Sequence, residues 1–531
     1  MKNKLVSGIV IVVVIITGIF ILQRSGTDRK VVAGVFSTDI TGLAEAKTSE
    51  TVELKNGDSY DLTASIVKKT IGNSEVKMLA YNSMIPGPTI KVPQGAEITV
   101  NFTNNTDVDT TIHSHGVRLD NKFDGVPDMT QKEVRPRESF TYKIKFPDVG
   151  IYWYHPHIRE DYAQELGLYG NFLVTSPEPF YWGEVDREET LFLDDILIEN
   201  GKIAPFDTAT ADRTLMGRFG NTMLVNGESD YKLPIKQGER VRFYITNSAN
   251  TRVFNFSIPN ARVKLVGADN GKYEREEWVE KVLLGPSERA VIEVWFDKAG
   301  DYPIIHTTPD KSYIMGLIKV IPGPVTTSYF LITRTNEDVI KSIDPLRSLF
   351  DKVADKRLKL TIDMGMQMQG MMQNNSGGHN MNMMGNDQMM SNNQMVASGD
   401  PIEWEENNVA MNTMSNPEMM KWVIEDEDTG KKNMDIDWKF KVGDKVKIKI
   451  TNDSNSMHPM QHPIHIHGQK FLVLSTNGVK NTNMVWKDTT LIQNGDTVEI
   501  LVDMENPGTW MAHCHIAEHL EASMMFGFKV E

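Results

Sequence analysis

A segment that occurs three times restricts the fold of this chain more than any other feature. Residues 93–104, 236–247 and 441–452 each contain a glycine turn and then a run that ends in Thr-Asn. Apolar and polar side chains alternate along each run, a period of two that is typical of a strand with one buried face. The apolar positions are Ile98, Val100 and Phe102, then Val241, Phe243 and Ile245, and then Val446, Ile448 and Ile450. Three copies predict three similar β-sandwich domains in an all-β chain.

The length of 531 residues agrees with several domains. We place domain 1 at residues 50–180, domain 2 at 181–345 and domain 3 at 346–531, after a segment at residues 1–30. That segment contains Leu5–Leu22, a run of 18 uncharged residues that is long enough to span a bilayer and has no good cleavage site after it. We therefore expect an N-terminal apolar helix that anchors the protein in a membrane, with a cleaved signal and a secreted protein as the alternative. Because such a segment is typical of exported proteins, we expect the protein outside the cytoplasm, in the cell envelope or beyond.

Histidine is scarce in this sequence but strongly clustered. Ten of the 13 histidines fall into four groups, and the last group surrounds Cys514, the only cysteine of the chain. The groups are His113 and His115; His155 and His157; His462, His465 and His467; and His513, His515 and His519. A single His-x-His pair is usually a surface feature, but four such groups indicate metal binding.

The group around Cys514 can serve two metal sites at once. Because alternate side chains of a strand leave opposite faces, His513 and His515 point to one side and Cys514 to the other. A cysteine thiolate, two imidazoles and a weak axial methionine are the ligands of a blue, electron-transferring copper. Cys514, His519 and Met524 supply three of these four ligands, and the fourth must come from elsewhere in the chain.

Four motifs resemble the copper signatures of the multicopper oxidases. HSHG, WYHPH, HPIHIHG and HCHIAEHLEASMM occur in the order of that family, and the resemblance covers the chain from about residue 50 to its end. It implies cupredoxin-like Greek-key β-sandwiches and four coppers per chain. The implied ligands are His462, Cys514, His519 and Met524 for type 1; His113 and His465 for type 2; His115, His155 and His515 for one type 3 copper; and His157, His467 and His513 for the other.

Domain 2 lacks such ligands. When the terminal strands of the three domains are aligned on a shared glycine, that of domain 2 carries only His306, one position out of step and without a partner. We interpret His306 as a packed or surface residue. Domain 1 has Pro156 at the position of Cys514, so it cannot build a type 1 site. The eight remaining histidines must then converge, which predicts a three-copper cluster at the interface of domains 1 and 3.

The resemblance also implies a mechanism. A donor gives single electrons at the edge of His462, and these pass through Cys514 to its neighbours His513 and His515, where four such transfers reduce O2 to water. Protons are needed as well, and Asp124 matches the acidic relay position of the family, although an aspartate before a glycine is also a common turn residue.

A second relay acid is less clear. The acid that often follows the last type 1 histidine is Leu520 in this chain. Glu518 and Glu521 are the candidates to replace it.

Domain 3 carries a methionine-rich insertion. The interval between the second and third repeat glycines exceeds that between the first and second by 62 residues, and residues 364–420 hold 15 of the 30 methionines. From Met364 to Asp400 the chain has no aromatic residue, lysine or arginine, so it cannot bury enough apolar surface to fold alone. We expect a disordered linker whose methionines bind metal rather than pack, because soft thioethers select Cu(I).

The place of this insertion resembles that in bacterial cuprous oxidases of the copper-efflux type. There, an aspartate and methionines near the type 1 histidine bind Cu(I). Asp363 and Met460 match part of that set, whereas His458 stands where an aspartate is expected. The resemblance therefore implies an enzyme of copper tolerance that oxidises Cu(I) or another metal ion with O2 as the acceptor.

Other functions stay open. A laccase-like phenol oxidase needs an open approach to His462, which the insertion can cover. A non-enzymatic copper-sequestering protein needs only the methionines, so the ten histidines and Cys514 argue against it, and copper nitrite reductases lack the paired type 3 ligands. The net charge of −15 argues against nucleic acid as a partner and favours cationic donors. We expect a monomer.

Overall fold

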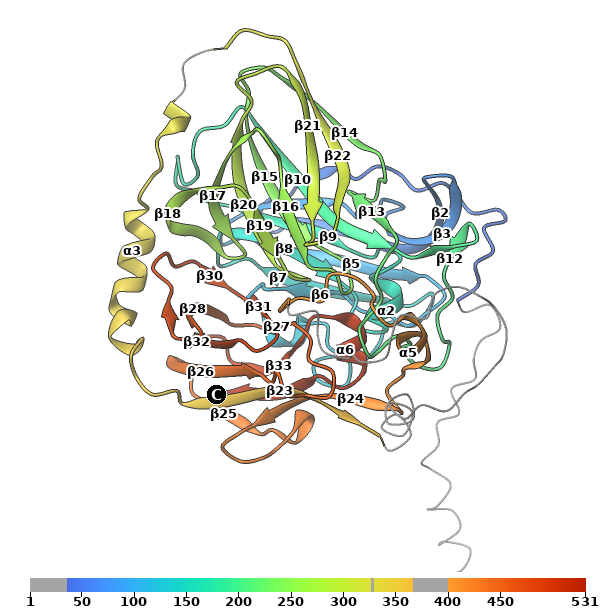
Figure 1. The fold of residues 1–531 in the computed structure, drawn as a ribbon, viewed down its shortest axis with the longest axis vertical. Coiled ribbons are helices and arrows are strands. Elements are labelled where there is room, and N and C mark those ends of the chain that lie inside the picture. The colour runs from blue at the N-terminus through green and yellow to red at the C-terminus, as the bar shows by residue number, and fades with distance from the viewer. Residues whose placement is uncertain (1–35, 326–328, 366–399) are drawn as a thin grey trace, which may run out of the picture. The chain divides into compact units, whose positions relative to one another are not determined.

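The computed structural model describes residues 36–325, 329–365 and 400–531 (Figure 1). Residues Thr38–Glu531 form one unit. The predicted helical anchor at Leu5–Leu22 and most of the methionine-rich insertion lie outside the described residues. Within the described part of the chain, no helix is both long and apolar enough to cross a membrane.

Three pairs of β-sheets follow one another along the chain, which confirms the predicted all-β fold. The first pair contains, in spatial order, β1 (Thr51–Glu53), β4 (Thr89–Pro93), β9 (Gly170–Thr175), β8 (Gly150–His155) and β6 (His113–His115), and then β3 (Ser74–Tyr81), β2 (Ser59–Ile71), β5 (Glu97–Asn105) and β7 (Ser139–Lys145). The rings of Tyr81 on β3 and Tyr154 on β8 lie 5.3 Å apart, so the two sheets share a core.

The second and third pairs are built in the same way. The second contains β13 (Thr222–Val225), β10 (Arg187–Ile196), β15 (Arg240–Asn247), β20 (Arg289–Trp295), β17 (Arg262–Ala268) and β18 (Gly271–Val279), and then β14 (Tyr231–Lys236), β22 (Ser312–Ile321), β21 (Gly300–Thr307), β16 (Phe254–Ser257) and β19 (Val282–Leu284). The third contains β24 (Met420–Asp426), β23 (Lys356–Met364), β26 (Asp444–Asn452), β32 (Thr497–Met504), β28 (Lys470–Thr476), β29 (Val479–Lys480) and β30 (Trp486–Lys487), and then β25 (Trp438–Phe440), β34 (Met525–Val530), β33 (Gly508–Cys514), β27 (His462–Ile466) and β31 (Thr489–Ile492).

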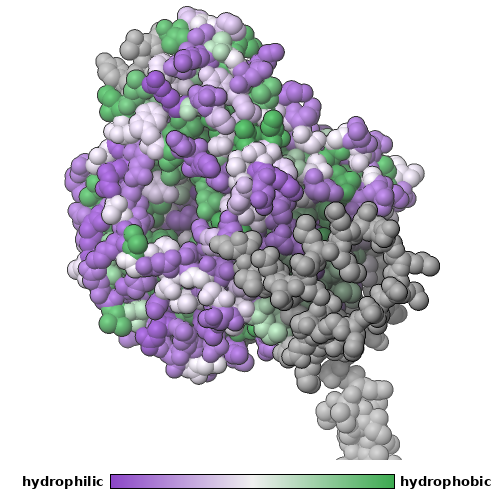
Figure 2. Space-filling view, viewed as in Figure 1, coloured by the Kyte–Doolittle hydropathy of each residue, from purple (hydrophilic) through white to green (hydrophobic). Residues whose placement is uncertain are grey.

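Short elements connect these sheets. They are β11 (Ile198–Glu199), β12 (Lys202–Ile203), α2 (Glu160–Ala163), α3 (Glu337–Ile343), α5 (Val409–Met414), α6 (Ala517–Glu521), and the 3-10 turns η1 (Asn121–Phe123), η2 (Tyr329–Leu331), η3 (Asp344–Leu349) and η4 (Asn433–Asp435). The connection with α3 runs along the edge of the third sandwich (Figure 1), where Ile343 packs against Leu472 and Leu501. The face shown in Figure 2 is mostly hydrophilic over the described residues.

The three repeated segments occupy one position in the three sandwiches. They form β5, β15 and β26, and each lies between a parallel strand and an antiparallel one, in the orders β2-β5-β7, β10-β15-β20 and β23-β26-β32. β5 alternates buried and exposed residues as predicted. β15 does not, because every residue from Val241 to Asn247 is buried.

β15 is buried on both faces because it contacts the first sandwich. Tyr244 on β15 packs against Ile151 and Leu173 of β8 and β9, and Thr246 donates a hydrogen bond to Asn171 at 3.1 Å. A strand covered on both faces loses its polar-apolar alternation. The prediction of a half-buried strand is therefore wrong for β15.

The two ends of the methionine-rich insertion are part of the third sandwich. Met364 ends β23 and faces Met420 on β24, and both are buried in the core that contains Cys514. Met411 on α5 and Met419 pack against the same core. The expectation that the methionines from Met364 to Asp400 bind metal rather than pack is thus wrong for Met364. The other three methionines lie after that segment, where the insertion returns through α5 and β24.

Candidate metal centre

Two pairs of neighbouring strands bring the clustered histidines together. On β6 and β8, His113 is paired with His155. On β27 and β33, His465 is paired with His513, and Ile464 with Cys514. His157, His467 and His515 follow directly after these strands, and His519 lies on α6.

Eight histidines of the first and third sandwiches meet at their interface. The rings of His113 and His467 stack with 4.0 Å between centroids, and those of His115 and His465 with 3.6 Å. Nitrogens of three triplets lie within 4.8 Å of one another: His113, His115 and His465; His115, His155 and His515; and His157, His467 and His513. The structure brings together all eight histidines that the sequence places at a three-copper cluster.

Contacts at Nδ1 leave Nε2 of most of these rings free for a metal. Nδ1 lies next to an oxygen atom in six histidines: His113 (2.7 Å), His155 (2.8 Å), His157 (3.3 Å), His465 (2.8 Å), His467 (2.9 Å) and His513 (2.8 Å). Nε2 of His467 and Nε2 of His513 face each other at 3.0 Å. Because both rings donate from Nδ1, two lone pairs meet there, a contact that a cation between them relieves. The donor set therefore fits a metal.

A second site lies on the other face of β33. Cys514 Sγ is 3.6 Å from His462 Nδ1 and 3.8 Å from His519 Nδ1, and the two nitrogens are 3.3 Å apart. Met524 is fully buried, and its carbonyl oxygen accepts a hydrogen bond from the N–H of Cys514 at 3.0 Å. A thiol, two imidazoles and a nearby thioether fit the ligand set of a blue copper.

Burial keeps these ligands neutral until a metal binds. It raises the pKa of the Cys514 thiol and lowers the pKa of His462 to about 3. It also lowers the pKa of His515 to about 3. Neutral imidazole is the form that binds metals, and a bound cation favours the thiolate.

Comparison with known proteins agrees with this geometry. Family models described as multicopper oxidase match residues 64–179, 194–320 and 404–531, which together cover more than half of the chain. The chain belongs to the multicopper oxidase family. It is therefore an oxidoreductase that uses O2 as the electron acceptor, and its family binds copper in type 1, type 2 and type 3 sites.

Relatives of this multicopper oxidase differ in their names. The multicopper oxidase mco of Staphylococcus aureus is 27% identical over 464 residues, 85% of this chain and 83% of that protein. Copper resistance protein A of Escherichia coli is 24% identical, over 90% of this chain and 93% of that protein. The structure of a laccase-like multicopper oxidase from Ochrobactrum, with activity towards lignin model compounds, superimposes with a TM-score of 0.68 at 22% identity, over 92% of this chain and all of that one.

Asp124 holds two histidines of the oxidase cluster. Its carboxylate accepts a hydrogen bond from His467 Nδ1 at 2.9 Å, and its carbonyl oxygen accepts one from His113 Nδ1 at 2.7 Å. Burial by itself raises the pKa of this carboxyl, but His467 and His113 outweigh burial, so the pKa lies below the usual range of aspartate. The turn at Gly125 is also required, because a Cβ there would lie 2.0 Å from the carbonyl oxygen of Ile112. Asp124 is thus a turn residue and a histidine partner at once.

The two candidate relay glutamates lie on α6. Glu518 accepts hydrogen bonds from Asn250 at 3.2 Å and Thr251 at 3.1 Å, and burial raises its pKa to about 7. Burial, with repulsion from Asp161, also raises the pKa of Glu521 to about 7. Leu520 packs against apolar residues instead.

Sequence reasoning missed Glu160 on α2. It is fully buried, with Oε1 3.3 Å from His157 Nδ1. Its place three residues after His157, at the start of a helix, was the available clue.

Sequence reasoning also missed residues of the second and third sandwiches that lie beside the cluster. Asp488 lies 3.0 Å from His115 Nε2, and Ser287 lies 2.9 Å from the same nitrogen. Arg289 donates to both carboxylate oxygens of Asp488 and to the carbonyl oxygen of Ile151 at 3.0 Å. Arg289 therefore joins all three sandwiches, and through it the second sandwich supports the cluster.

The residues suggested for a donor metal ion lie in different surroundings. Met460 is fully buried in the core that contains Cys514. Asp363 is exposed, on the face of β23 opposite to buried Ile362 and Met364. His458 lies beside Trp422, with 6.3 Å between the ring centroids, and its Nε2 is buried without a hydrogen-bond partner.

His306 lies in the second sandwich, away from both histidine sites. Its ring is fully buried and parallel to that of Tyr313 at 5.7 Å, and its Nδ1 accepts a hydrogen bond from the N–H of Asn255 at 3.1 Å. We expect His306→Ala to leave the copper content unchanged and to lower the free energy of unfolding by about 1–3 kcal/mol, because it leaves a buried N–H unpaired. Metal analysis of the purified variant checks this, with His462→Ala as the control that loses type 1 copper.

Proposed function

We propose that this multicopper oxidase takes its electrons from a metal ion, Cu(I) first, and serves copper tolerance. The observation that carries the proposal is the closure of the type 1 site: His462 is 1% exposed and His519 is 0% exposed. A phenol needs contact with an imidazole edge, and these two imidazoles have almost no surface in solvent. The buried thioethers of Met460 and Met420 in the same core add a preference for soft ions.

Bound copper supplies one-electron redox chemistry and the reduction of O2 to water. The residues of the chain hold the histidine rings in place and exclude water from the cluster. Asp124 fixes the rings of His113 and His467, and burial of all eight cluster histidines keeps bulk water out. We propose that Glu518, Glu521 and Asp124 carry protons toward the cluster, since Asp124 and Glu518 are buried acids and burial raises the pKa of Glu518 and of half-buried Glu521 to about 7.

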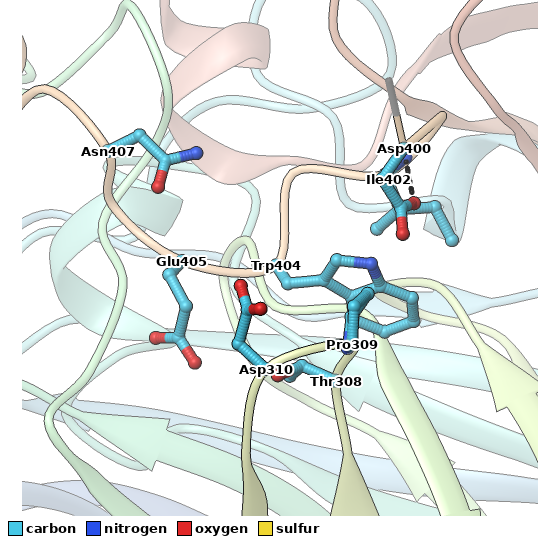
Figure 3. Close-up of a pocket in the computed structure, with 8 residues that line it drawn as sticks. All are labelled: Thr308, Pro309, Asp310, Asp400, Ile402, Trp404, Glu405 and Asn407. Atoms are coloured by element: carbon cyan, nitrogen blue, oxygen red, sulfur yellow. Dashed lines mark hydrogen bonds between the residues drawn. The ribbon is translucent and has the colours of Figure 1, made fainter. Parts of the chain in front are cut away.

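An acidic cavity near the returning end of the insertion supports a cationic donor. The cavity has a volume of about 400 Å³ and is lined by Thr308, Pro309, Asp310, Asp400, Ile402, Trp404, Glu405 and Asn407. Figure 3 shows the indole of Trp404 beside the Thr308–Asp310 turn, with the carboxylates of Asp310 and Glu405 on one side of it. The backbone N–H of Glu403 donates to Gln461, the neighbour of His462, at 2.8 Å. Negative charge close to the type 1 strand raises the local concentration of cations.

The relatives support both candidate donors. The name of the Escherichia coli relative speaks of copper resistance, and the Ochrobactrum structure is called laccase-like. A phenol oxidase is therefore the second candidate. For the donor ion we propose Met460 and His458 at the type 1 side, and Asp363 as an outer carboxylate at the end of β23. We further propose a place in the cell envelope, reached through the apolar segment Leu5–Leu22.

The insertion offers a direct test of the donor. Replacing the methionines of residues 366–399, which lie outside the described residues, with serine should lower Cu(I) oxidation at limiting copper by about tenfold, because it removes soft ligands that deliver the ion. Oxidation of 2,6-dimethoxyphenol should be unchanged. The matched control replaces asparagines of the same segment with serine and should alter neither rate. Two results together would favour the laccase candidate: equal Cu(I) kinetics in the methionine variant and the wild type, and a wild type that oxidises the phenol faster than Cu(I).

A further inference from the structure

An indole ring covers both imidazoles of the type 1 site. Trp422 on β24 is 1% exposed. Its ring stacks on that of His519 with 4.2 Å between centroids and meets that of His462 edge-on at 4.8 Å. One side chain thus fills the space directly against both of these rings.

The second sandwich holds this indole in place. Trp422 Nε1–H donates to the carbonyl oxygen of Thr214 at 2.8 Å, and Thr214 Oγ1 donates to Met420 Sδ at 3.2 Å. Thr214 belongs to a loop at residues 213–219, named here the covering loop. Leu215, Met216 and Phe219 of the covering loop are buried in the core that contains Cys514 and Trp422.

The covering loop is in turn bonded to the chain that follows the insertion. The N–H of Leu215 donates to Ser415 at 2.9 Å, the N–H of Met216 donates to Asn412 at 2.9 Å, and Asn412 donates to the carbonyl oxygen of Gly217 at 2.9 Å. Asn412 is fully buried. Moving the loop would break these buried bonds together, so the indole is fixed rather than loosely placed.

We propose that Trp422 determines the donor specificity of this oxidase. Its ring excludes bulky aromatic donors from the type 1 imidazoles, and the enzyme therefore discriminates against phenols in favour of metal ions. The inference rests on the proposed function and names the side chain responsible for it. Trp422 acts by filling space, because its one side-chain hydrogen bond goes to the backbone of Thr214 and to no ligand.

Two substitutions in the copper-loaded enzyme test the proposal. Trp422→Ala removes the ring system, whereas Trp422→Phe keeps an aromatic six-membered ring and loses the N–H donor together with the five-membered ring of the indole. The ratio of kcat/KM for 2,6-dimethoxyphenol to kcat/KM for Cu(I) should rise about tenfold or more in the alanine variant. It should stay within about twofold of the wild type in the phenylalanine variant. An unchanged ratio in an alanine variant with intact blue absorption, or an equal rise in both variants, overturns the proposal.

A second readout needs no turnover. Cys514 is the only cysteine, so thiol labelling of the copper-free full chain reports access to the type 1 site alone. A bulky aromatic maleimide should label Trp422→Ala about tenfold faster than the wild type, while the rate with small iodoacetamide should change much less. Equal increases for both reagents, the mark of a loosened fold, contradict the proposal, as does no increase.

The same assays distinguish a failure of the role proposed for Trp422 from a failure of the proposed metal-ion donor. If Trp422→Ala does not fold, Trp422→Leu carries the test, because leucine is apolar and fills only part of the space. A wild type that prefers the phenol to Cu(I) refutes the metal-ion donor itself. A wild type that prefers Cu(I), with variants that keep this preference, refutes only the role of Trp422.

Discussion

Replacing Cys514 with serine is expected to abolish oxidation of every donor while most of the copper stays bound. The substitution removes the soft thiolate, which is joined through the backbone of Cys514 to its neighbours in the chain, His513 and His515. The eight cluster histidines are not part of the type 1 site, and contacts such as His467 to Asp124 and His465 to Asp488 stay in place. The variant should be colourless and should retain about three coppers per chain.

Metal analysis, visible absorption and turnover with Cu(I), Fe(II) and a phenol check this expectation. Met511→Leu is a suitable control, because Met511 is a buried residue of the same strand that is not a ligand and a volume-conserving change there is tolerated. Appreciable turnover in a verified Cys514→Ser protein contradicts the role assigned to the thiolate. Loss of all four coppers would show instead that the two sites do not fold independently.

Arg289→Ala is expected to be the most destabilising change outside the copper ligands. Arg289 and Asp488 are both fully buried, and the substitution leaves the carboxylate of Asp488 without its partner. Removing one member of a buried ion pair costs about 3–5 kcal/mol. Because Asp488 also contacts His115 Nε2 through its carboxylate and His465 Nδ1 through its carbonyl oxygen, the variant should bind copper at the cluster more weakly.

Chemical unfolding and the copper content of the purified variant measure both effects. Arg240→Ala is the matched control: it lies in the same sandwich and pairs with Asp186 at the surface, so it should cost less than about 1 kcal/mol. An Arg289→Ala protein as stable as this control would show that the bridge between the three sandwiches contributes little.

The ligands of the metal centre could be predicted because they belong to local patterns. The alternation of a strand places Cys514 opposite to His513 and His515, and register then pairs His465 with His513. The threefold repeat predicted the strands β5, β15 and β26 because each copy is a local pattern of a glycine turn and alternating side chains. The ligand pattern and the repeated strands depend on residues close in the sequence, and the pairing of His465 with His513 depends on two neighbouring strands only.

The supporting residues could not be predicted, because they depend on contacts between sandwiches. Arg289 and Asp488 are 199 residues apart, and Trp422 and Thr214 are 208 apart. Nothing in the type or spacing of an arginine or a tryptophan indicates such a partner. The burial of β15 and of Met364 has the same origin, since the covering surface comes from a distant part of the chain.

The copper positions themselves give the most direct test of this account. A crystal of the copper-loaded protein, measured at the copper absorption edge, would locate each ion by its anomalous scattering. The account predicts one ion between His462, Cys514 and His519, and three among the eight histidines at the interface of the first and third sandwiches. An ion at His306, or an empty triplet of His157, His467 and His513 in fully loaded protein, would contradict it.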